Sequence, residues 1–384
     1  MARGYRSFTK EQRFLVLAAI SIFLPYFITG VVAVVFTGYF LLQKEYRDRL
    51  LVTKGFRPLL CVFAIALVIP ATRGYWVGIG AGVMLCVILL FFLFARMIIT
   101  RQVLMHILDT ACLLSLVSLV VAVLQYAMHQ LQHDPNRSVS VFMNANYYGD
   151  MIVMIILCCV YQLINGSKRP GFYMAVIACN LLGQVLSDSM SALVALMGGI
   201  IIMLLLRGKR TAFCLMCGFM VLCLFAMISL PSVFPRSAFL EHTIGARAEI
   251  WFTAIRAIQD SPFWGHGVTG YFSIYNQYGA FMTYHAHSLY LNPLLDLGFI
   301  GTGFLLAFLY RMFQPALPAV RAGKDRELCS LLFAQLTAVL IHGVTDITCM
   351  WIQTGMFLSL LFTIPALLAP VEQQSFRLVR ATDP

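Results

Sequence analysis

The sequence predicts an all-α polytopic membrane protein with about twelve transmembrane helices and one large extracytoplasmic loop that contains short amphipathic helices. Hydrophobic residues make up 60% of the 384 residues and charged residues only 11%, a composition typical of integral membrane proteins rather than soluble domains. The apolar residues gather in runs that approach the roughly 20 residues needed to cross a bilayer. No internal repeat or low-complexity linker divides the chain, so we expect a single membrane domain over residues 1–384.

The apolar runs predict the helices in chain order. Residues 14–42 are too long for one ordinary span, and Pro25 and Gly30 interrupt them, so two short helices are predicted there. Further spans are predicted at 58–71, 75–95, 111–128, 147–165, 172–187, 192–206 and 211–230. After a hydrophilic stretch, three more are predicted at 298–313, 329–343 and 350–369. The large loop, residues 231–297, therefore lies between the ninth and tenth spans.

The basic residues predict the orientation, because Lys and Arg are retained on the cytoplasmic side of a membrane. Of the 27 Lys and Arg residues, all but five fall in one set of alternate gaps and tails. This distribution predicts that both termini are cytoplasmic and that the large loop faces outward. The net charge of +11 does not indicate a nucleic-acid partner, because the basic residues sit in short gaps rather than on one exposed domain. The five exceptions, on the outward side, are Arg73, Arg137, Arg236, Arg247 and Arg256.

The most polar patterned segment ends the large loop. His285 and His287 come first, and a helical run then places a polar stripe on one face at i, i+4 and i+8. Glycines follow where the helix enters the membrane, which favours close helix packing or a sharp re-entry. The stripe consists of Ser288, Asn292 and Asp296, and the glycines are Gly298, Gly301 and Gly303.

Residues 246–260 predict an amphipathic helix within the loop. Its apolar stripe contains Ile250, Trp251, Ala254, Ile255 and Ile258, and its polar face contains Glu249, Thr253, Arg256 and Asp260. At about 100° per residue, Arg247 projects onto the apolar side, in line with Trp251. A guanidinium on that side faces inward or needs an anion, so Arg247 is the first candidate among the outward arginines.

Three shorter outward segments carry further candidates. Asn144 and Asn146 open a span, where amides can recognise hydroxyl groups or cap the helix. Asp188 joins two spans and can cap the next helix or contribute to a site. His342 and Asp346, four residues apart at the end of a span, are interpreted as a structural pair.

The motifs together resemble the O-antigen ligase and O-antigen polymerase superfamily of bacterial envelope glycosyltransferases. The first motif is a histidine and a small polar residue, followed after nine residues by G-x-x-G, here His287, Ser288, Gly298 and Gly301. The second is an arginine, a tryptophan and a P-x-x-G-x-G loop, here Arg247, Trp251, Pro262, Gly265 and Gly267. The third is F-x-N-x-N, here Phe142, Asn144 and Asn146. One departure is Met190, where many members have an arginine.

The resemblance implies a transfer of glycan from undecaprenyl diphosphate to an acceptor hydroxyl, such as lipid A core, with inversion at the anomeric carbon. It also implies a bacterial inner membrane and no cofactor. A metal is not required, because the sequence has no D-x-D and no outward cluster of carboxylates. His287 is expected to be the general base, or else a hydrogen-bonding group, and Arg247 to stabilise the leaving diphosphate. Further expected contacts to diphosphate or sugar are Arg236, Arg73, Arg137, Asn144, Asn146, Ser288, Asn292, Asp296, Trp251 and His285.

The sequence leaves two alternative functions open. A polymerase of the same superfamily would extend the glycan on its own lipid carrier. A polysaccharide transporter or lipid flippase is less favoured, because transporters place ionisable residues at mid-membrane, whereas the polar residues here gather on one face.

Overall fold

A computed structural model describes residues 7–132, 137–229 and 240–369. Within these ranges the chain is helical and has no strand, which confirms the predicted all-α class. The helices are α2 (Lys10–Ser21), α3 (Tyr26–Leu42), α4 (Lys44–Val52), α5 (Phe56–Thr72), α6 (Trp76–Ile98), α7 (Arg101–Leu131), α8 (Ala145–Ile164), α9 (Pro170–Ser187), α10 (Met190–Leu206), α11 (Arg210–Ser229), α12 (Leu240–Asp260), α13 (Gly270–Ile274), η2 (Tyr275–Tyr278), α14 (Leu291–Phe313), η3 (Gln314–Ala316), α15 (Leu317–Arg321), α16 (Arg326–His342), η4 (Thr348–Met350), α17 (Ile352–Leu361) and α18 (Ile364–Leu367).

Most predicted apolar runs coincide with one helix, whereas the predicted span 350–369 is divided among η4, α17 and α18. The 14–42 run divides into α2 and α3 beside Pro25, as expected from a residue that cannot donate within a helix. The basic segment after α3 was not predicted to be helical; it forms α4, which is bent by 90° from α3. Among the described residues, five helices are long and apolar enough to cross a membrane, or six if that bent pair is one span. The count of twelve spans remains a prediction.

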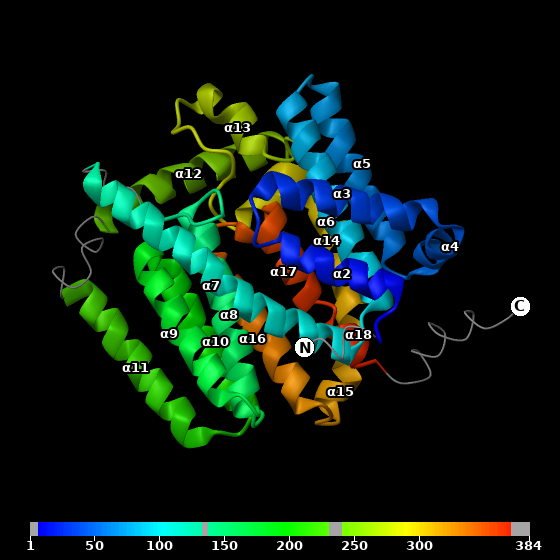
Figure 1. Cartoon of the computed structure of the whole chain (residues 1–384). Coiled ribbons are helices and arrows are strands. Elements are labelled where there is room, and N and C mark those ends of the chain that lie inside the picture. Colours follow the sequence, from blue (N-terminus) through cyan, green and yellow to red (C-terminus); the bar gives the residue numbers. More distant parts are fainter. Residues whose placement is uncertain (1–6, 133–136, 230–239, 370–384) are drawn as a thin grey trace, which may run out of the picture.

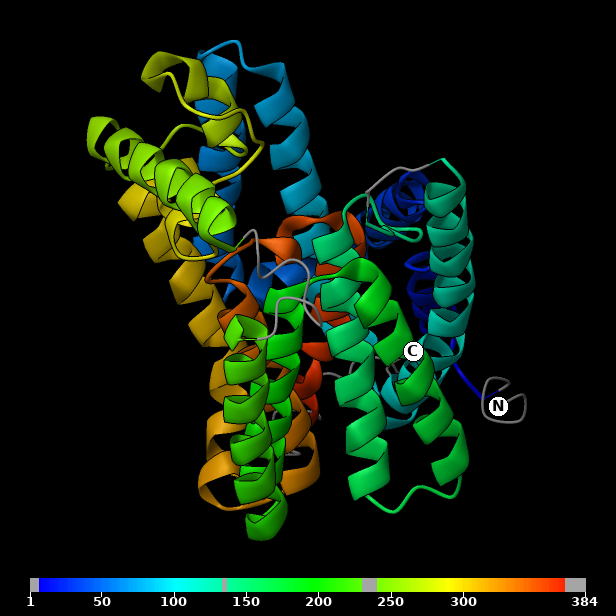
Figure 2. The same ribbon diagram turned by 90° about the vertical axis from the view of Figure 1, so that its left-hand side faces the viewer.

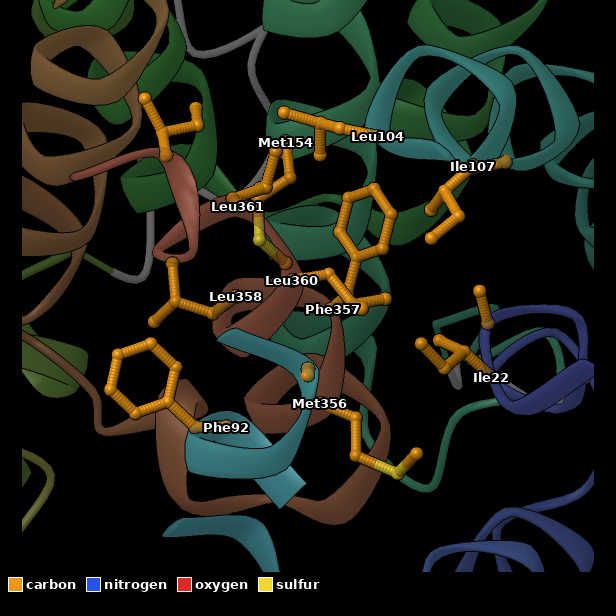
Figure 3. Packing of buried hydrophobic residues seen from close by; sticks show 14 of the residues in the cluster. Ile22, Phe92, Leu104, Ile107, Met154, Met356, Phe357, Leu358, Leu360 and Leu361 are labelled. Carbon is orange, nitrogen blue, oxygen red and sulfur yellow. The ribbon is translucent and has the colours of Figure 1, made fainter. Parts of the chain in front are cut away.

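The helix α17 is the centre of the apolar core. All ten of its residues are buried, including the polar Gln353, Thr354 and Ser359. Phe357 and Leu360 point among side chains from α6, α7 and α8, including Phe92, Leu104 and Met154 (Figure 3). Neighbouring helices, rather than lipid, therefore surround α17.

The helices of the large loop lie together at one end of the molecule. Figures 1 and 2 both place α12 and α13 at that end, with α15 at the opposite end. The helix α12 begins earlier than the predicted 246–260, and its predicted apolar residues Ile250, Ala254 and Ile258 are buried. They join Tyr271 of α13 in a second, smaller apolar core. The same packing buries Thr253, which was wrongly expected on the polar face.

A break inside α14 holds the loop that precedes α13. Gly298 has a φ of 66° and interrupts the helix, and the backbone groups freed there bond to the 262–267 loop. The amides of His266 and Gly267 donate to the carbonyls of Leu295 and Asp296 at 2.8 and 2.9 Å. From the other side of the break, the amides of Phe299 and Ile300 donate to the carbonyls of Pro262 and Phe263 at 2.7 and 3.2 Å. The P-x-x-G-x-G loop is thus hydrogen-bonded to α14 on both sides of its break. The sharp re-entry predicted there consists of this loop and the break in α14.

We expect Gly298→Ala to destabilise the protein strongly. A Cβ at this position would lie 2.3 Å from the carbonyl carbon of Phe263, and a non-glycine residue in this conformation costs about 1–3 kcal/mol before any clash. The matched control is Gly303→Ala, because a Cβ there meets nothing within 4 Å. Thermal unfolding of the purified variants measures the difference. Equal unfolding temperatures for the two variants would show that the break does not need glycine.

Candidate active site

His287 occupies a restrained turn immediately before α14. Its φ of 46° lies in the left-handed region, which non-glycine residues seldom adopt, so surrounding contacts must hold it there. Its carbonyl accepts a hydrogen bond of 3.3 Å from the indole Nε1 of Trp251. The hydroxyl of Ser288 accepts from the amides of Tyr290 and Leu291 at 3.3 and 3.4 Å and so stabilises the turn that leads into α14. The motif Ser and the motif Trp therefore hold the backbone that carries His287.

The imidazole of His287 faces the carboxylate of Asp346. Its Nδ1 lies 3.3 Å from Asp346 Oδ1, and its Nε2 lies 3.1 Å from the hydroxyl of Thr283. The two side chains differ in access, since that of His287 is 23% exposed and that of Asp346 is 1% exposed. A buried carboxylate thus holds one edge of a ring that solvent and ligands can reach.

Asp346 has two further donors, which fix its orientation. The amide of Ile347 donates to Oδ1 at 2.8 Å, and the side-chain amide of Asn146 donates to Oδ2 at 2.6 Å. The Oδ1 of Asn146 in turn accepts a hydrogen bond of 2.9 Å from Arg137, whose Nε donates to the carbonyl of Ser187. A continuous chain of hydrogen bonds therefore connects Arg137 to His287 through an amide and a carboxylate.

His285 completes a group of three side chains that we call the histidine cluster: His285, His287 and Asp346. The Nδ1 of His285 lies 3.8 Å from Asp346 Oδ1, and the two imidazole centroids are 4.3 Å apart. Its Nε2 lies 3.4 Å from the hydroxyl of Tyr147. One nitrogen or oxygen atom from each of the three side chains lies within 4.8 Å of the others. This set of donors is one that could hold a metal ion.

The electrostatics of the histidine cluster give its members different charges at neutral pH. Burial raises the pKa of Asp346, but the hydrogen bond from His287 and the nearby histidine charges outweigh burial and hold that pKa well below its ordinary value. Burial lowers the pKa of His285 to about 4, although the charge of Asp346 acts in the opposite direction. Asp346 is therefore ionised and His285 is neutral near pH 7.

Arg247 reaches the same region from α12. Its Nε donates a hydrogen bond of 3.1 Å to the carbonyl of Thr345, the residue immediately before Asp346. The guanidinium therefore lies inward, on the side that helical periodicity predicted. Two elements that are distant in sequence, α12 and the turn after α16, meet at this point.

The other predicted site residues are placed at the edges of this arrangement or outside it. Arg73 bonds to the Nδ1 of His266 at 2.8 Å and to the carbonyl of Gly265 at 3.1 Å, so it holds the loop that joins α14. Asn144 caps α8 by accepting from the amide of Asn146 at 2.7 Å. Of the two roles expected of Asn144, hydroxyl recognition and helix capping, the structure shows capping. Arg236 lies outside the described residues.

Asn292 and Asp296 are buried beneath the histidine-bearing turn. Asn292 accepts from the amide of Ala286 at 2.9 Å and donates to Asp296 at 2.7 Å. Asp296 also accepts from the amide of Gly270 at 2.9 Å. Both side chains are 2% exposed or less. Their hydrogen bonds connect the His287 turn to the start of α13. Asn292 and Asp296 therefore stabilise the fold beneath the site.

Asp346 is the member of the histidine cluster that the sequence interpretation misassigned. It was expected to pair with His342 at helical spacing; the backbone amide of Asp346 does donate to the carbonyl of His342 at 3.1 Å, but α16 ends at His342 and the two side chains bond elsewhere. The Nε2 of His342 instead lies 3.3 Å from the hydroxyl of Ser191, and the carboxylate of Asp346 turns to His287. The available signal was an acidic residue in an outward turn between two apolar runs.

The comparisons with known proteins match a segment that carries part of this site. Residues 173–306 match the family model described as O-antigen ligase, a segment that runs from α9 into α14 and contains Arg247, Trp251, His285 and His287. Asp346, Asn146 and Arg137 lie outside it. A search of curated proteins gave no match. This match supports the superfamily resemblance, and it covers two of the three motifs, those that contain Arg247 and His287.

Proposed function

We propose that this chain is a ligase-type glycosyltransferase that moves a glycan from undecaprenyl diphosphate to an acceptor hydroxyl, such as one on lipid A core. In this proposal the chain crosses the bacterial inner membrane about twelve times with both termini in the cytoplasm, and the reaction occurs on the outer face. The observation that carries the proposal is the accessible imidazole of His287 beside the buried, ionised carboxylate of Asp346. Arg247 is bonded to the carbonyl of Thr345, the residue before Asp346.

His287 is proposed as the general base. With a proton on Nδ1 donated to Asp346, the Nε2 lone pair is available to accept the proton of an attacking hydroxyl. The hydroxyl of Thr283, 3.1 Å from Nε2, marks a position that an acceptor hydroxyl can take. The acceptor oxygen bonds to the anomeric carbon as its proton passes to Nε2. The bond from that carbon to the diphosphate breaks, and the electron pair leaves with undecaprenyl diphosphate, so the configuration inverts.

Arg247 is proposed to bind the leaving diphosphate. Negative charge grows on the phosphate oxygens as the bond breaks, and a guanidinium offers them a planar set of donors. The carbonyl of Thr345 anchors this guanidinium beside the base. Arg137, Asn146, Trp251, Ser288, Asn292 and Asp296 are proposed to support the site, and Arg73 to hold the loop next to it.

We expect Arg247→Lys to lower the rate of glycan transfer by about 100-fold or more, because lysine keeps the charge and loses the paired donors. The matched control is Arg256→Lys, since Arg256 lies on the same helix and is exposed on its opposite face. Both proteins are purified in nanodiscs and assayed with labelled undecaprenyl-diphosphate glycan. Equal losses in the two variants would remove the diphosphate role of Arg247.

The acceptor separates the ligase from the polymerase. Wild-type protein is incubated with the labelled donor, with and without a lipid A core acceptor. A ligase produces labelled glycolipid only when the acceptor is present. A ladder of longer glycans on undecaprenyl diphosphate without any acceptor would identify a polymerase and overturn the ligase assignment.

A further inference from the structure

We propose that the histidine cluster binds one Zn²⁺ ion and that the bound ion blocks glycan transfer. The binding of zinc is a property of the three side chains alone. Its effect on transfer rests on the function proposed above, in which His287 is a base that needs no metal. Zinc is thus proposed as an inhibitor that competes for the base rather than as a cofactor.

The distances within the histidine cluster suit tetrahedral zinc. Ligands at 2.0–2.1 Å from a tetrahedral Zn²⁺ lie about 3.3 Å from one another. Asp346 Oδ1 lies 3.3 Å from the Nδ1 of His287 and 3.8 Å from the Nδ1 of His285. Small movements of the His285 ring would bring the two Nδ1 atoms and Asp346 Oδ1 to three corners of one tetrahedron. Two imidazoles and one carboxylate also form a donor set that zinc uses with a fourth, open position.

The outer contacts of the three ligands are those that a zinc site needs. When Nδ1 of a histidine binds a metal, its Nε2 carries the proton and requires an acceptor. The Nε2 of His287 has the hydroxyl of Thr283 at 3.1 Å, and the Nε2 of His285 has the hydroxyl of Tyr147 at 3.4 Å. The second oxygen of Asp346 is held by Asn146 at 2.6 Å. Each ligand is thus oriented by a partner on the side away from the proposed ion.

Two hydrogen bonds are exchanged when the ion binds. The Nδ1 of His285 accepts a long bond of 3.3 Å from the amide of His287, and this lone pair passes to the metal. The proton that His287 shares with Asp346 moves from Nδ1 to Nε2, with no net loss of a proton. Nε2 then has no lone pair for an acceptor hydroxyl, so a bound zinc ion removes the proposed base.

The experiment measures binding and transfer separately on the full-length protein in nanodiscs. Zn²⁺ alone is titrated in competition with a coloured chelator, and the bound ion is examined by X-ray absorption. We expect one saturable site with nitrogen and oxygen ligands at about 2.0–2.1 Å. Removing one ligand, in His285→Ala or His285→Asn, should weaken binding by more than about 100-fold, since even partners of ligands contribute about 10–100-fold. His129→Ala is the matched control and should bind zinc as wild type does.

The transfer assay is then run with Zn²⁺, with Mg²⁺ and with Zn²⁺ followed by a chelator. Zinc should stop transfer, magnesium should leave it unchanged, and the chelator should restore it. The site is overturned if zinc does not saturate, or if either His285 variant binds it as tightly as wild type. The inhibitory role is overturned if bound zinc leaves the rate unchanged or raises it. Absence of transfer in metal-free protein would count against the transferase proposal alone, because binding is measured without glycan.

Discussion

Replacing His287 by alanine is expected to lower the rate of glycan transfer by about 100- to 10,000-fold, the range that a positioned general base contributes. The attacking hydroxyl would then have to lose its proton to water. Because the ring is 23% exposed and its Nε2 bonds to the hydroxyl of Thr283, its removal leaves no large cavity in the apolar core. The initial rate of labelled glycan transfer in nanodiscs gives the loss.

The interpretation of the His287 variant depends on an intact fold. The control is His129→Ala, which removes a histidine near the end of α7, outside the histidine cluster. Both variants should insert, accumulate and unfold thermally like wild type. Full activity in His287→Ala would show that this imidazole is neither the base nor an essential hydrogen-bonding group.

Asp346→Asn is expected to have an effect of similar size, about 100- to 10,000-fold on kcat. An asparagine can place its NH2 group against the Nδ1 of His287, which drives the ring proton to Nε2 and occupies the lone pair that takes the acceptor proton. Asparagine nearly matches aspartate in volume, so the substitution leaves no cavity; an NH2 group in the place of Oδ1 loses the hydrogen bond from the amide of Ile347 and keeps the one from Asn146.

A positioning role for Asp346 differs from a purely structural role in its kinetics. We expect kcat to fall while KM for the donor stays near the wild-type value, because the diphosphate contact proposed for Arg247 remains. Asp260→Asn, an exposed substitution on α12, is the control and should keep both constants. If Asp346→Asn raises KM and lowers the unfolding temperature without lowering kcat, the residue supports the fold and does not orient the base.

Much of the fold could be predicted because it follows from local pattern. Most apolar runs coincide with one helix, and Gly298, the first residue of the tenth predicted span, marks the break in α14. The inward direction of Arg247 followed from its place in the 3.6-residue repeat of α12. The helix α4 was missed because its charged residues carry no apolar run.

The partners of His287 could not be predicted in the same way. Asp346 and Asn146 are far from His287 in the chain. The packing of α8 against α16 and the hydrogen bond from the amide of Leu289 to the carbonyl of Gly343 bring the three together. The polar stripe of Asn292 and Asp296 was visible, but a stripe does not show whether substrate or backbone will satisfy it. Here the amides of Ala286 and Gly270 do so.

The most direct measurement is the fate of the labelled donor in proteoliposomes that contain only wild-type protein. If the chain is a transferase, the label moves to the acceptor hydroxyl, undecaprenyl diphosphate is released in equal amount, and both processes stop in His287→Ala. If the label instead crosses the bilayer while still bonded to undecaprenyl diphosphate, with the same rate in wild type and in His287→Ala, the chain is a transporter and the transferase proposal is wrong.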